Sequence, residues 1–162
     1  MDIERTLTET INEDGKALNL EGKISGAATE LTEVEVLDVL RRGLTRLPAS
    51  TSNLGNLTML NLNHNKLTQF PEVVLDLVNL THLFVNDNQL SALPANLNYL
   101  DKLQELELRN NKLKRVFANI LDLKNLEKLS VAGNPLTDQE VRSLMMLMAW
   151  KSQRMLIDII AG

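Results

Sequence analysis

The fold of this chain is decided by residues 57–71, which read LTMLNLNHNKLTQFP. Aliphatic and polar residues alternate from Leu60 to Leu62, as in a short β-strand that rests one face on an apolar core. Asn65 follows three positions later, and the stretch ends on a proline. The pattern predicts a strand, a sharp turn and the start of a return path.

This pattern recurs every 23 residues, marked by four asparagines: Asn65, Asn88, Asn111 and Asn134. Aliphatic residues stand eight, five and three positions before each of them, at Leu57, Leu60, Leu62, Leu80, Leu83, Val85, Leu103, Leu106, Leu108, Leu126, Leu129 and Val131. One period upstream the same spacing finds Val34, Leu37 and Val39, with Arg42 in place of the asparagine. We expect about five coils over residues 34–136, which bury their apolar faces by stacking.

The recurring asparagine has a predicted structural role at the bend that leaves each strand. Its side-chain amide can both donate to and accept from backbone groups of its own turn and of the neighbouring coil. Those groups would otherwise be buried without partners, at a cost of about 1–3 kcal/mol each. Asn65, Asn88, Asn111 and Asn134 are therefore expected to form a structural ladder.

The consensus LxxLxLxxNxLxxLPxxLxxLxN resembles the leucine-rich-repeat family, in the 23-residue form common in bacterial and intracellular members. This resemblance covers roughly residues 34–136. It implies an α/β fold, a right-handed solenoid shaped as a short curved horseshoe, with a parallel sheet on the concave face. The sequence departs from the pattern at Arg42, at Phe117 in place of proline, and at Lys102 in place of asparagine.

We expect one domain over residues 1–162, with a cap at each end of the stack. In the N-terminal cap, residues 1–33, Ile3, Leu7 and Ile11 have the spacing of an amphipathic helix, and a degenerate coil follows near Leu18. In the C-terminal cap, residues 137–162, a capping box from Thr137 to Glu140 predicts a helix. Its predicted inner face comprises Val141, Leu144, Met145 and Met148. Residues 155–160 fit either a closing strand or a helical turn.

Composition limits the classes of function. The net charge is −4, without a long run of either sign, which disfavours a nucleic-acid partner. The absence of cysteine excludes disulfides, thiolate metal sites and a cysteine nucleophile. We expect no cofactor or metal. The start of the sequence has no signal-like run and no stretch reaches the length of a membrane span, so a cytoplasmic location is expected, with a secreted bacterial effector as the alternative.

The residues between the buried leucines should point to the concave surface. We predict the partner-binding residues to be Met59, Asn61, Asn63, His82, Phe84, Asn86, Glu105, Glu107 and Arg109. An exposed aromatic residue, Phe84, beside a charged rim is typical of an interface hot spot. Five strands spaced ~4.8 Å apart span about 20 Å, which suits a helix or a loop of a partner protein.

Two other interpretations compete with recognition. Glu105 and Glu107 share one face and could form a catalytic or metal-binding carboxylate pair. They lie on an open sheet, however, and we expect Arg109 to neutralise them, which favours a solvated or partner-facing charge patch. No phosphate loop, paired-histidine motif or nucleophile triad is found, so we expect no enzyme and no catalytic residue. The resemblance likewise implies a recognition module. The remaining alternative is a weak homodimer, rather than a monomer, formed through the Met145–Met148 run and Trp150.

Overall fold

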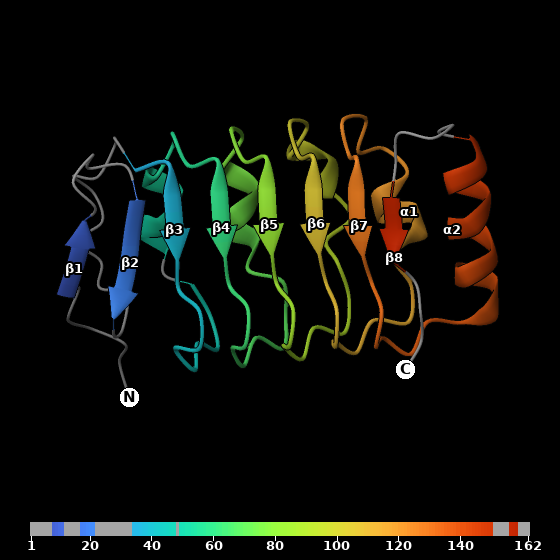
Figure 1. The fold of residues 1–162 in the computed structure, drawn as a ribbon, viewed down its shortest axis with the longest axis horizontal. Coiled ribbons are helices and arrows are strands. Elements are labelled where there is room, and N and C mark those ends of the chain that lie inside the picture. Colours follow the sequence, from blue (N-terminus) through green and yellow to red (C-terminus); the bar gives the residue numbers. More distant parts are fainter. Residues whose placement is uncertain (1–7, 12–16, 22–33, 48, 151–155, 159–162) are drawn as a thin grey trace.

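The computed structural model describes residues 8–11, 17–21, 34–47, 49–150 and 156–158. Its described strands form one sheet in which chain order and spatial order coincide (Figure 1). They are β1 (Thr8–Ile11), β2 (Ala17–Glu21), β3 (Val36–Asp38), β4 (Met59–Asn61), β5 (His82–Phe84), β6 (Glu105–Glu107), β7 (Lys128–Ser130) and β8 (Leu156–Asp158). From β2 to β8 all neighbours are parallel, so each strand requires a crossover.

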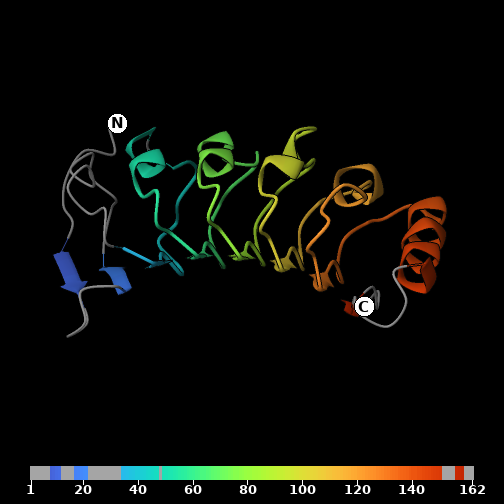
Figure 2. The ribbon, with the colours of Figure 1, turned by 90° about the horizontal axis from the view of Figure 1, so that it is seen from above.

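The crossovers carry short helical segments on the opposite side of the stack. They are the 3-10 helices η2 (Ala49–Asn53), η3 (Glu72–Asp76) and η4 (Leu97–Tyr99), and the helices α1 (Phe117–Ile120) and α2 (Asp138–Trp150). Figure 2 shows that the strands lie closer together than these segments, so the sheet forms the concave side. The predicted fold, a leucine-rich-repeat solenoid with a parallel concave sheet, is confirmed.

The core is the stacked aliphatic ladder that the spacing predicted. The central residues of β3 to β7 are each exposed by 1% or less: Leu37, Leu60, Leu83, Leu106 and Leu129. The twelve aliphatic positions before the asparagines are all buried, and so are the crossover residues that close the core, Val74, Leu77, Leu97, Leu100, Ile120 and Leu123. Burying one such side chain contributes roughly 1.5–3 kcal/mol, so the inner wall is fixed by the stacking of many like coils.

The turns after the strands repeat in detail. The Oδ1 atom of Asn88 accepts a hydrogen bond from the N–H of Leu67 at 3.0 Å, and its amide nitrogen donates to the carbonyl of Leu62 at 2.9 Å. Asn65, Asn111 and Asn134 make the same two bonds to the coil before them. The residue before each asparagine has a positive φ; these residues are His64, Asp87, Asn110 and Gly133.

The N-terminal end corrects one prediction. Ile11 lies in strand β1, so the amphipathic helix predicted from Ile3, Leu7 and Ile11 is wrong for the described residues 8–11; Ile3 and Leu7 lie outside them. The helical spacing of three aliphatic residues is outweighed by backbone pairing, because β1 pairs antiparallel with β2 along four residue pairs. The expected degenerate coil contains β2, whose Leu18 pairs in register with Leu37.

The C-terminal helix begins as predicted but buries a different face. The N–H of Glu140 donates to Oγ1 of Thr137 at 3.3 Å, which is half of the expected capping box. Leu144 and Leu147 are buried, whereas Met145 is 57% exposed, so the predicted inner face was wrong at Met145. Leu144 and Leu147, which are three positions apart and so lie on one side of the helix, form its buried face. The side chain of Met148 lies outside the described part. None of the described helices has the length and apolar character to cross a membrane.

Candidate binding face

The sheet register arranges the predicted binding residues in rows. Met59, His82 and Glu105 pair across β4, β5 and β6, and Asn61, Phe84 and Glu107 form the parallel row. Asn63, Asn86 and Arg109 follow two residues later, at the strand ends. The two rows continue onto Val36 and Asp38 of β3, onto Lys128 and Ser130 of β7, and onto Leu156 and Asp158 of β8.

The half of this face over β6 to β8 is occupied by its own ion pairs. Nζ of Lys128 contacts Oε1 of Glu105 and lies 2.9 Å from Oε1 of Glu107. Arg109 pairs with Asp158 of β8. The expectation that Arg109 neutralises the two glutamates is therefore wrong. Lys128 continues the row of Glu105 one strand further, and β8 brings Asp158 within reach of Arg109.

The charge network changes the proton affinity of its members. Burial raises the pKa of Glu107, but hydrogen bonds from Lys128 and from Asn86, whose amide is 2.7 Å from Oε2, outweigh it and hold the pKa below its usual value of 4.5. The hydrogen bonds to Glu105 and then Glu107 raise the pKa of Lys128 above 10.5. Glu107 and Lys128 are therefore both charged near neutral pH, which is the state of a structural ion pair and not of a poised general acid.

The half over β3 to β5 carries no such cluster among its described residues. Val36, Met59 and Phe84 are half-buried and lie outside the aliphatic core. The rings of His82 and Phe84 are 6.3 Å apart and tilted by 46°, and Nδ1 of His82 lies 2.8 Å from Oγ1 of Thr81. This open half therefore combines apolar surface with a ring held in place by its neighbours.

Asparagine side-chain amides line the open half where its strands end at their C-termini. Oδ1 of Asn61 accepts from the N–H of Asn63 at 3.0 Å, and Oδ1 of Asn63 accepts from the N–H of Asn86 at 2.6 Å. A backbone N–H can only donate, so these contacts fix which amide atom is oxygen. The NH₂ groups of Asn61 and Asn63 make no hydrogen bond within the described residues and remain available as donors.

The predicted binding residues left out two members of the face, Lys128 and Asp158. Lys128 stands 23 positions after Glu105, so the repeat itself placed it in the next strand of the same row. Asp158 lies in β8, a segment for which strand and helix were both left open. The structure makes residues 156–158 a strand parallel to β7.

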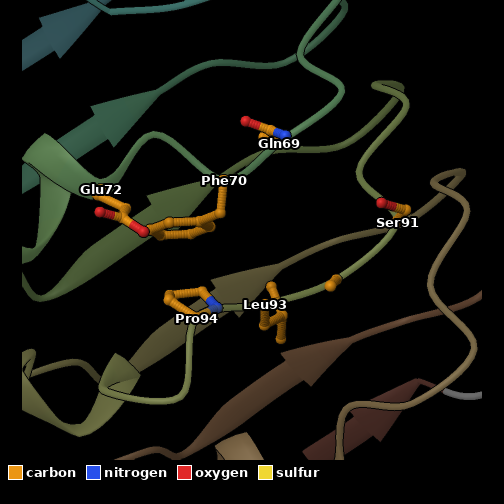
Figure 3. Close-up of a pocket in the computed structure, with 7 residues that line it drawn as sticks. Gln69, Phe70, Glu72, Ser91, Leu93 and Pro94 are labelled. Carbon is orange, nitrogen blue, oxygen red and sulfur yellow. The ribbon is translucent and has the colours of Figure 1, made fainter.

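A separate depression of about 500 Å³ lies between two coils, away from the sheet. It is lined by Gln69, Phe70, Glu72, Ser91, Ala92, Leu93 and Pro94. Figure 3 shows Phe70 and Pro94 on neighbouring coils, with Glu72 beside the Phe70 ring. Glu72 is the one charged group of this lining, so it lacks a titratable pair for acid–base chemistry. Among the described residues no cluster of three or more His, Asp or Glu side chains is arranged for a metal ion.

Comparison with known proteins identifies the class. The family described as Leucine rich repeat matches residues 32–90. A leucine-rich-repeat protein of Leptospira interrogans is 32% identical, with a TM-score of 0.78 over 89% of this chain and 37% of that one. Internalin C2 of Listeria monocytogenes str. 4b F2365 shares the fold at 24% identity, with a TM-score of 0.63 over 85% of this chain and 54% of that one. No curated protein matches the sequence.

This chain is a leucine-rich-repeat protein. It spans 37% and 54% of the lengths of those two structural relatives. Domains of this fold are generally protein–protein interaction modules, and they are typically without catalytic activity.

Proposed function

We propose that this chain is a non-catalytic recognition module that binds a helix or loop of a partner protein on the concave face, over β3 to β5. The observation that carries the proposal is the asymmetry of that face. Phe84 and Met59 stay partly exposed on adjacent strands, whereas the carboxylates of Glu105 and Glu107 already share Lys128.

The free energy of association favours the open half. A partner that covers Phe84 and Met59 gains about 25 cal/mol for each Å² of apolar surface it removes from water. A partner that covers Lys128 must instead remove water from charges that are already paired, which returns little. The ion cluster therefore acts as the rim of the site and the apolar half as its centre.

The dimensions of the open half match a single secondary-structure element. Three strands at ~4.8 Å spacing place the outer two about 10 Å apart. An α-helix with its side chains is about 10–12 Å wide. The half-face is therefore about as wide as one helix or one loop.

The test is a quantitative pull-down from extracts of the source organism and of candidate host cells. Phe84→Asp places a charge at the centre of the proposed site. Tyr99→Asp is the matched control, because Tyr99 is 61% exposed on the convex side. We expect Phe84→Asp to remove partners that Tyr99→Asp retains. If both variants keep the same partners as the wild type, the concave-face proposal is wrong.

Self-association is a second candidate, favoured by the exposure of Met146 (73%) and Trp150 (74%) on α2. An exposed apolar helix face can pair with its own copy, with the same patch used on both subunits. Light scattering over a range of protein concentrations measures the mass directly. A dimer that Trp150→Asp converts to a monomer supports this candidate, and a monomer at every concentration eliminates it.

A further inference from the structure

We infer that the partner segment carries a basic side chain next to an apolar one, with the basic group seated over Phe84 between Asp38 and the Glu105–Glu107 pair. This inference rests on the proposed function and adds the chemistry of the partner. Its support is the charge of the concave rows and the position of the Phe84 ring within them.

The described concave face has an excess of carboxylates. From β3 to β8 its rows and strand ends hold four, at Asp38, Glu105, Glu107 and Asp158, and two cations, at Arg109 and Lys128. These four carboxylates and two cations sum to a formal charge of −2. An acidic partner segment would be repelled, whereas a basic one would be attracted and oriented by the same field.

The cations of the face are already committed to carboxylates. Lys128 is shared by Glu105 and Glu107, and Arg109 pairs with Asp158. Among the described residues, no Lys or Arg side chain therefore neutralises the second charge of the Glu105–Glu107 pair or that of Asp38; Nε2 of His82 lies 3.9 Å from Oε2 of Glu105. Asp38 uses Oδ1 to accept from its own turn, the N–H of Leu40 at 3.0 Å, which fixes the carboxylate near the end of its strand.

Phe84 lies between these charges. In its row the order is Asp38, Asn61, Phe84 and Glu107 on successive strands. A cation placed on an aromatic face within about 6 Å of the ring centre is attracted by the ring. At a strand spacing of ~4.8 Å, the same cation is also close to the Glu107 side chain. An aromatic ring with one carboxylate on the adjacent strand and another two strands away on the other side is a site for Lys or Arg.

The neighbouring groups accommodate the rest of such a segment. Met59 and Val36, in the adjacent row, provide the apolar surface for a side chain beside the basic one. The NH₂ groups of Asn61 and Asn63, whose oxygens are engaged by backbone N–H groups, can donate to backbone carbonyls of the segment. These uncharged donors would orient the segment through its backbone, whatever the charge of its side chains.

The test is selection of random linear peptides on the immobilised full chain, with peptides that also bind Phe84→Ala removed. We expect the remaining peptides to be enriched in Lys or Arg beside Leu, Ile or Phe. For the best peptide, Phe84→Ala should weaken binding about tenfold or more. Glu107→Gln should weaken it about two- to fivefold, in a salt-sensitive manner. The control is Glu72→Gln, a carboxylate off the concave face, which should leave binding unchanged.

The outcomes separate the two proposals. Phe84-dependent peptides that are acidic or uncharged overturn the basic partner and leave the concave binding site standing. Equal effects of Glu107→Gln and Glu72→Gln also overturn it. A carboxylate away from the concave face would then affect binding as much as one on it, so only the net charge of the chain would matter. A selection that yields no Phe84-dependent peptide contradicts both the inference and the proposed binding site.

Discussion

Glu140 caps Phe117: its Oε2 accepts a hydrogen bond from the backbone N–H of Phe117 at 2.9 Å, and a second from Val116 at 3.0 Å. In the two preceding coils the equivalent of Phe117 is a proline, Pro71 or Pro94, which has no N–H to satisfy. The departure from the repeat at Phe117 thus creates a donor, and the cap helix α2 supplies its acceptor.

Replacing Glu140 should loosen the C-terminal cap. Glu140→Ala leaves two backbone donors without their acceptor, at about 1–3 kcal/mol for each that stays buried. Glu140→Gln keeps an accepting oxygen and should lose less. Urea unfolding followed by circular dichroism gives the free energy of unfolding. Gln139→Ala, an exposed neighbour in the same helical turn, is the control; a loss as small as that of the control would show that the cap bond contributes nothing.

Removing one rung of the asparagine ladder should destabilise the stack more than any surface change nearby. Asn88→Ala leaves the N–H of Leu67 unpaired in a buried turn, at about 1–3 kcal/mol, and removes one of the two amide donors to the carbonyl of Leu62, the other being Asn65. Asn88→Asp keeps the acceptor but loses the donor, so it should still destabilise. Thermal and urea unfolding measure the change, with exposed Gln89→Ala as the control. A result for Asn88→Asp equal to wild type would contradict the donor role.

The ion cluster predicts an acid-sensitive contribution to stability. The pKa of Glu107 in the folded chain lies below 4.5, so its stabilisation is complete above the unfolded-state pKa and is lost as pH falls through the folded one. Wild type and Glu107→Gln should therefore differ most near neutral pH and converge as the pH falls below the lowered pKa of Glu107. Unfolding free energies over this range test it; a difference that is independent of pH would exclude the charge as the cause.

Glycine at position 133 should be required for two separable reasons. Gly133 has a φ of +71°, and a Cβ there would overlap Oδ1 of Asn110, whose amide nitrogen donates to Asp87 at 2.8 Å. Gly43 has a φ of +67° but open space around it. Gly43→Ala should thus cost only the backbone strain, about 1–2 kcal/mol, and Gly133→Ala should cost more.

Thermal unfolding of both alanine variants, and of Gly133→Ala in an Asn110→Gly background, separates strain from overlap. The glycine at 110 removes the overlapping amide and suits the positive φ of that position. We expect the added cost of Gly133→Ala to fall to that of Gly43→Ala in this background. An unchanged cost would mean that the overlap is relieved elsewhere.

The sequence predicted the structure of the repeated coils, but its prediction for the N-terminal cap, which lies outside the repeat, was wrong. Leu60, Leu83 and Leu106 occupy like places because each coil presents the same face to its neighbour, so one period predicts the next. Ile11 was misplaced because three aliphatic residues at helical spacing also fit a strand, and pairing with Leu18 decides between them. Only tertiary contacts carry that information.

Within the candidate face, positions were predictable but partnerships were not. The register placed Phe84 beside Asn61 and Glu107, as the 23-residue spacing requires. The choice of Lys128 over Arg109 as the counter-ion depends on side-chain reach across strands and on β8, where the consensus no longer applies. The 23-residue period predicts where each residue lies on the sheet. The ion pairs depend on the charges of the folded chain and on the reach of each side chain.

Strands β2 and β3 pair in register although Ala17 and its partner Val36 are 19 positions apart, where the next pair, Val36 and Met59, is 23 apart. The inner wall therefore keeps its alignment when the length of the connection changes. Insertions and deletions on the outer arc can then accumulate over evolution without moving a recognition residue, so variation in repeat length and conservation of the contact surface are compatible in one chain.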